Sequence, residues 1–147
     1  MAHVRKQIRD KFSEILSSGV SLVSSRVYGS RVYPLTEAKL PAITVYAGGE
    51  ASELNTMGLK TLSRTLSVSV DVYARATQTL DDDLDAICVQ VENAIAAQYT
   101  LNGLSKNTVL SSTDIDFSGD AEQPVGVARL TFDVLYHTSI DDAETAR

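Results

Sequence analysis

The sequence has 147 residues, of which 44% are hydrophobic and 22% charged, and its formal net charge is −6. This length fits one domain that can bury a core, and the composition is that of a soluble globular protein. The acidic balance argues against a nucleic-acid-binding module, in which basic residues are in excess. A single cysteine allows no internal disulfide, and no apolar run approaches the ~18 residues of a membrane span, so we expect no membrane partner.

The first predicted element is a helix that starts near Val4. Apolar residues recur at spacings of three and four up to residue 16, and Gly19 is a plausible stop because glycine adopts the left-handed conformation at little cost. The helix carries a basic cluster: Arg5, Lys6, Arg9 and Lys11. Such a cluster could contact nucleic acid, but no aromatic residue is interleaved with it, so a solvated helix face is the favoured interpretation.

A four-residue segment occurs twice after this helix. Ser-Arg-Val-Tyr occurs at residues 25–28 and again at residues 30–33, which predicts a short strand or extended arm with a bulge at Gly29. Residues 42–46 then alternate as a strand, and Gly48-Gly49 is predicted to end it.

Residues 50–61 show no clean period, although they join two strands that should pair. A connection of this length is either a mobile hairpin tip or a functional arm. Charges of both signs lie in it or at its end, which favours an arm that contacts a partner or another subunit. The predicted interface residues are Glu50, Glu53, Lys60 and Arg64.

Two long strands dominate the pattern. Within residues 62–73, apolar residues alternate at positions 66, 68, 70 and 72, and residues 128–136 alternate in the same way around Phe132. A period of two marks a strand with one buried face. Each strand therefore needs a second layer to cover its apolar side.

A second helix is predicted between these strands. Thr79 is a candidate N-cap, and residues 81–83 are three aspartates in the first turn, where the helix dipole favours negative charge. The aspartate run lacks the alternating ligands and the glycine of a calcium loop, so we interpret it as capping. Cys88 falls within the apolar stripe of this helix, which predicts a buried core residue and not a nucleophile.

The remaining segments have less regular hydrophobic patterns. Residues 108–117 form a less regular strand, with Val109, Ile115 and Phe117 predicted on one face. The tail from about residue 139 is polar, and we expect it to be flexible unless a partner orders it.

Together these elements predict one domain over residues 1–147 of the mixed α/β (α+β) class. We expect a mainly antiparallel sheet of about four strands, with two helices packed on one face and the long loop between the two central strands. His3 and His137 have no spacing that suggests a catalytic set, and the sequence contains no glycine-rich phosphate loop or metal-ligand cluster. We therefore expect neither an enzyme nor a cofactor.

Three stretches resemble a known family: residues 3–9, residues 30–35 and residues 40–46. They are similar to the tail terminator proteins of long-tailed bacteriophages (siphoviruses), the family of the lambda minor tail protein U. The similarity follows the whole chain in order and length, but its motifs are packing and turn residues, so no individual binding residue is carried over.

This resemblance implies a hexameric ring in the virion, at the head-proximal end of the tail, after assembly in the host cytoplasm. The ring would cap the tail tube, stop its polymerisation and provide a surface for head–tail joining. The implied partners are other copies of the chain, the tail tube protein and a head-completion or neck protein, with DNA passing through without specific binding. The alternatives are another neck or tail-completion protein of the same fold, or a small ligand-binding regulatory α/β domain with a concave apolar pocket.

Overall fold

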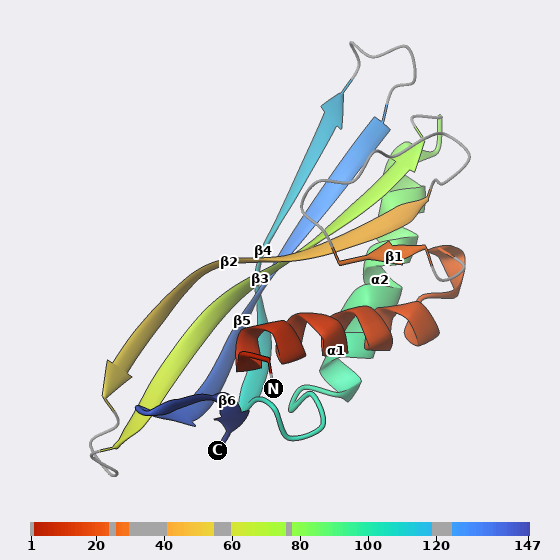
Figure 1. Ribbon diagram of the computed structural model, residues 1–147. Coiled ribbons are helices and arrows are strands. Elements are labelled where there is room, and N and C mark those ends of the chain that lie inside the picture. Colours follow the sequence, from red (N-terminus) through yellow and green to blue (C-terminus); the bar gives the residue numbers. More distant parts are fainter. Residues whose placement is uncertain (1, 24–25, 30–40, 55–59, 76–77, 119–124) are drawn as a thin grey trace.

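The computed structural model describes residues 2–23, 26–29, 41–54, 60–75, 78–118 and 125–147 (Figure 1). In chain order the elements are α1 (Val4–Gly19), the short 3-10 helix η1 (Ser21–Val23), β1 (Val27–Tyr28), β2 (Ala42–Leu54), β3 (Thr61–Arg75), α2 (Leu80–Ala97), β4 (Asn107–Ser118), β5 (Val125–Ser139) and β6 (Asp142–Ala146).

The strands form one sheet in the order β1-β2-β3-β5-β4, and β6 pairs with β5 where β4 no longer reaches. β1 runs parallel to β2, and all other neighbours are antiparallel. The predicted mixed class and the two helices are confirmed, but the expected number of about four strands is too low. β1 has only two residues and β6 comes from the polar tail, so neither carries the apolar alternation by which a strand is recognised in sequence.

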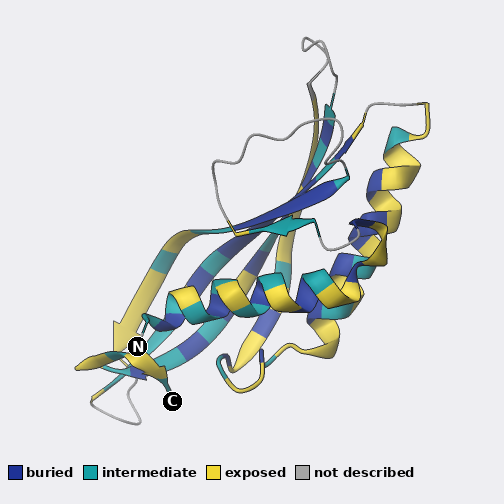
Figure 2. Ribbon diagram, turned by 45° about the vertical axis from the view of Figure 1, so that its right-hand side comes forward, coloured by how far each residue is buried: buried dark blue, intermediate teal, exposed yellow. Residues whose placement is uncertain are grey.

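Both helices lie on one side of the long, twisted sheet (Figure 1), and the core fills the space between the two layers. The apolar alternation of β3 and β5 points into this space: residues 66, 68, 70 and 72 are fully buried, and so are residues 128, 130, 134 and 136. All five apolar residues of the α1 stripe are buried as predicted (Figure 2). Phe12 of α1 meets Phe132 of β5 edge to face, with ring centroids 5.7 Å apart, and this contact joins the layers.

The prediction that Gly48-Gly49 ends a strand is wrong. The pairing of β2 with β3 shifts between Ala47 and Glu50, so the two glycines form a β-bulge and the strand continues to Leu54. Two residues without side chains allow the strand to bend without a clash, and pairing then resumes. Half of the predicted long loop, residues 50–54 and 61, is therefore paired strand, and its centre, residues 55–59, lies outside the described residues.

A second bulge corrects the prediction for β4. Val109, Ile115 and Phe117 do not share one face, because the pairing with β5 shifts between Leu110 and Ser112. Val109 lies opposite Asp133, on the side away from the helices, whereas Ile115 and Phe117 lie opposite residues of the helix-facing row. One extra residue reverses the alternation of every side chain that follows it.

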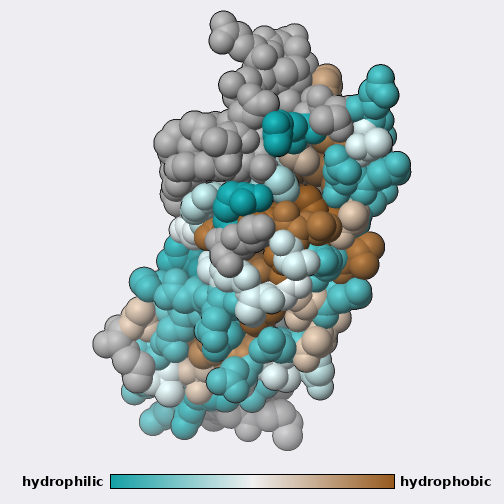
Figure 3. Space-filling model, turned by 90° about the vertical axis from the view of Figure 1, so that its right-hand side faces the viewer, coloured by the Kyte–Doolittle hydropathy of each residue, from teal (hydrophilic) through white to brown (hydrophobic). Residues whose placement is uncertain are grey.

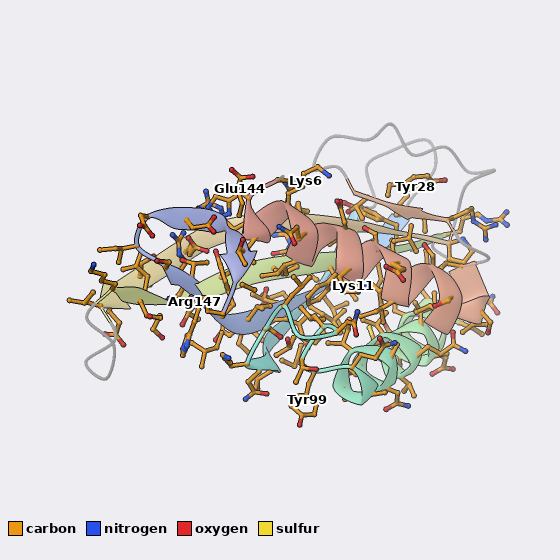
Figure 4. All side chains as sticks on the ribbon, turned by 60° about the horizontal axis from the view of Figure 1, so that its bottom comes forward. Lys6, Lys11, Tyr28, Tyr99, Glu144 and Arg147 are labelled. Carbon is orange, nitrogen blue, oxygen red and sulfur yellow. The ribbon has the colours of Figure 1, made fainter. Side chains whose placement is uncertain are left out.

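The polar tail is paired in this structure. Strand β6 pairs with β5, and Arg147 N–H donates to His137 O over 2.8 Å. Gln7 of α1 donates its side-chain amide to Glu144 O, also over 2.8 Å. Figure 4 accordingly shows Glu144 on the same side of the molecule as Lys6. The expected flexibility of this tail remains a prediction.

Two smaller expectations are confirmed. Thr79 occupies the N-cap position of α2, although its hydroxyl contacts the carboxylate of Asp83 and does not cap a backbone N–H. Cys88 is buried in the core. Of the repeated Ser-Arg-Val-Tyr segments, β1 covers the end of the first, and the second lies outside the described residues.

Candidate functional site

The four predicted interface residues separate into two pairs. Glu53 and Lys60 are exposed near the end of the β2–β3 hairpin, where Glu53 lies opposite Ser63. Glu50 and Arg64 instead face the helix side of the sheet, where they meet in an ion pair with Nη1 and Oε2 3.3 Å apart. Their side chains are only 8% and 11% exposed, so this second pair is built into the fold.

Glu50 is the centre of a polar cluster at the start of α1, which we call the Glu50 cluster. Its carboxylate accepts hydrogen bonds from Arg5 at 3.1 Å, from Arg64 and from the hydroxyl of Tyr136. Arg64 also donates to the hydroxyl of the buried Thr138 over 3.0 Å. These contacts connect α1, β2, β3 and β5, and two arginines compensate a carboxylate that is nearly removed from water.

His3 lies beside this cluster at the N-terminal end of α1. It is the N-cap of α1, and its Nδ1 accepts from Arg5 N–H over 3.0 Å. The pKa of His3 is lowered, first by burial and then by the positive charges of Arg5 and Arg64, which outweigh the opposite effect of Glu50. Burial and the hydrogen bond to Glu50 raise the pKa of the Tyr136 hydroxyl, so that group remains a donor.

The other face of the sheet, which neither α1 nor α2 covers, has its own buried carboxylate. Asp71 is 2% exposed and accepts two hydrogen bonds from Arg129, at 2.9 and 3.2 Å. The hydroxyls of Tyr46 and Tyr73 also donate to it, at 3.0 and 3.5 Å. Burial, and next the Asp71 charge, raise the pKa of both tyrosines. The alternation placed Asp71 on the polar face of its strand, but its pairing with Arg129 follows from strand register, which spacing alone does not reveal.

The described residues contain no group of three His, Cys, Asp or Glu side chains that could hold a metal ion. The thiol of Cys88 is unsuited to nucleophilic chemistry, because burial and the nearby charges of Glu92 and Asp85 raise its pKa to about 11. None of the helices within the described ranges is long and apolar enough to cross a membrane.

A hollow of about 320 Å³ lies where α2 meets the end of β3. Its lining includes the apolar side chains of Leu22, Ala74 and Ile87 beside the charged side chains of Arg75 and Asp83. Figure 3 shows hydrophobic surface between hydrophilic side chains on this side of the molecule. Mixed lining of this kind is found in small-molecule sites, so the ligand-binding alternative would place its ligand here.

Comparisons with known proteins give a family. Residues 3–136 match the family model described as phage minor tail protein U. No curated protein matches the chain at a significant level. Among solved structures, the chain is similar to a component of a particle described as the virion of a native gene transfer agent, at 16% sequence identity and a TM-score of 0.45, over 90% of each chain.

Proposed function

Since this chain belongs to the phage minor tail protein U family, and is therefore a structural protein of a phage tail, we propose that it is the tail terminator. In this role it forms a ring, of six copies by resemblance to the family, at the head-proximal end of the tail tube. The ring stops addition of further tube protein and presents its opposite side to a head-completion or neck protein. The work is done by surfaces, so the protein is not an enzyme.

The observation that carries this proposal is the family match over residues 3–136, which covers the helices, the core strands and the β2–β3 hairpin. The structure adds a suitable contact element. The paired end of that hairpin extends beyond α1 (Figure 1), and residues 51–54 of β2 are exposed on both faces. Glu53 and Lys60 are thus available to a neighbour, whereas Glu50 and Arg64 hold the base of the hairpin in place.

The charge of the chain fits passage of DNA. A formal net charge of −6 gives the ring an acidic balance, and acidic walls repel a polyanion instead of retaining it. The basic residues Lys6 and Lys11 of α1 are each paired with a carboxylate of the same helix, at 2.6 and 2.9 Å. DNA therefore passes without specific binding.

The test is the length of tail tubes assembled in the presence of the protein, measured by electron microscopy. Wild-type protein is expected to end tubes at a defined length, with a ring visible at one end. A variant with Glu53→Ala, Leu54→Ser and Lys60→Ala changes only exposed residues of the hairpin end and is expected to leave longer, uncapped tubes.

A thermal melt that matches wild type is the control for folding of this variant. If the wild-type protein leaves tube length unchanged but binds a head-completion protein, the terminator role is wrong and the protein is a neck component. If only the variant fails, the hairpin end is part of the tube- or subunit-binding surface.

A further inference from the structure

The helix layer leaves the later part of one strand of the sheet uncovered. α1 lies against β1, β2 and β6, and α2 lies mainly against β3 and β5, with a smaller contact to β4 (Figure 2). On β4, Ile115 and Phe117 point to the helix side, opposite Ala128 and Gly126 of β5. Ala128 is fully buried, yet Ile115 and Phe117 are each 56% exposed. We call these two side chains the β4 apolar strip.

One flank of α2 borders this strip and is acidic. The opposite flank is fixed against the α1 side by a hydrogen bond of 3.1 Å from Gln90 to Ser21 and by the close packing of Ala94 against Gly19. At 100° per residue, the side that faces away from α1, toward β4, carries an exposed set that we call the acidic flank: Asp81, Asp85 and Glu92. In total α2 holds five acidic residues and no basic residue.

The opposite edge of the molecule is basic. Arg5 and Arg9 of α1, which we call the basic flank, border a hollow of about 320 Å³ over the bulge at Gly48. Arg5 is 43% exposed although it pairs with Glu50. Arg9 has no carboxylate partner among the described residues. The two edges of one molecule thus carry charges of opposite sign.

We propose that a second copy of this chain docks head to tail on the first, with its basic flank against the acidic flank of α2 and its α1 over the β4 apolar strip. Contact between two acidic flanks would place like charges together, which favours a heterologous contact over a twofold one. In the order β1-β2-β3-β5-β4, β1 is parallel to β2, and β2 and β4 run in opposite directions, so a head-to-tail copy brings its β1–β2 side antiparallel to β4. Each copy keeps one flank of each sign available, and such a contact repeats until a ring closes. This inference rests on the proposed ring and specifies its subunit contact.

The experiment uses charge reversal and sedimentation velocity of the full chain. Arg9→Glu and Glu92→Arg, each alone, are expected to weaken self-association at least ~10-fold, because a like-charge pair replaces an attractive one. An equimolar mixture of the two variants should regain the wild-type mass, since each supplies the flank that the other lacks. The double variant should regain it as well. Asp133→Arg is the matched control for Glu92→Arg, because it makes the same charge change at an exposed position of β5 on the uncovered face, and it should leave the mass unchanged.

Phe117→Ser tests the apolar part of the contact and should lower the mass without changing the net charge. Unchanged mass in all these variants would overturn the inference, as would a loss that neither the mixture nor the double variant restores. A wild-type chain that stays monomeric at its highest soluble concentration would also overturn it. Loss of tube binding with unchanged self-association would assign the surface to a basic partner, the tube protein, and overturn docking of a second copy. The tube-length assay tests the terminator role separately. A result against this subunit contact therefore does not contradict that role.

Discussion

At the scale of single residues, buried charge is the feature that the structure changes most. Glu50, which the sequence suggested as an interface residue, lies 8% exposed between Arg5 and Arg64. Removing one member of a buried ion network leaves the others desolvated and unpaired, which costs more than the network contributes when it is complete. The Glu50 cluster is therefore a point at which small changes have large effects on stability.

Glu50→Gln is expected to lower the free energy of unfolding by about 3 kcal/mol, at the low end of the range for breaking a buried pair because Arg5 remains partly solvated. Glu53→Gln, three residues along the same strand and exposed, is the matched control and should stay within ~0.5 kcal/mol of wild type. Urea titration of both variants measures the difference. Equal stabilities would mean that Glu50 is solvated in solution.

His3 predicts a pH dependence. Its pKa in the folded protein is lowered, so below the ordinary value of about 6.5 the unfolded chain binds more protons than the folded chain. The stability contribution of neutral His3 is fully present above pH ~6.5 and is lost as the pH falls below that value. His3→Asn keeps a side chain that can cap α1 but does not titrate, so it should remove this part of the pH dependence. Denaturant titrations between pH 7.5 and 5.5 test this, and an identical pH profile in the variant would contradict it.

At the scale of elements, the docking of α2 on the sheet depends on one glycine. A Cβ on Gly126 of β5 would lie 2.7 Å from both terminal methyl carbons of Leu80, at the start of α2. Leu80 therefore packs directly on the backbone of β5, and a side chain at Gly126 would push the helix away from the strand.

Gly126→Ala is expected to destabilise the protein by ~1–3 kcal/mol, the usual cost of overpacking. Gly49→Ala is the matched control, because a Cβ there would meet no atom within 4 Å and should have little effect. Thermal melts of the two variants give the comparison. If Gly126→Ala has the same melting temperature as the wild type, Leu80 adopts another rotamer without loss of stability.

At the scale of the whole molecule, charge is segregated between the two sides of the helix layer. α1 holds four basic and two acidic residues, whereas α2 holds five acidic residues only. The protein therefore has a basic edge although its net charge is −6, and its affinity for DNA can be tested.

We expect no measurable affinity for duplex DNA at physiological salt. The Kd should lie above ~100 µM, which is the weak end of non-specific binding. The two lysines of α1 are paired within the helix, and the acidic flank opposes close approach of phosphates. Fluorescence anisotropy with a labelled duplex measures this. Low-micromolar binding with a steep salt dependence would show that the basic flank contacts DNA and not a neighbouring subunit.

The sequence by itself determined the periodic parts of this protein. The stripe of α1, the alternation of β3 and β5 and the burial of Cys88 follow from apolar spacing, because burial of one face requires that spacing. The family resemblance was also readable from the chain. Tertiary structure alone decided the two bulges, the pairing of β1 and β6, and the burial of Glu50 and Arg64 in an ion pair. A bulge changes which face every later side chain occupies, and a polar strand is held by backbone hydrogen bonds to a distant partner. Neither effect leaves a periodic signal, so the four predicted interface residues could not be separated from the sequence into a buried pair, Glu50 and Arg64, and an exposed pair, Glu53 and Lys60.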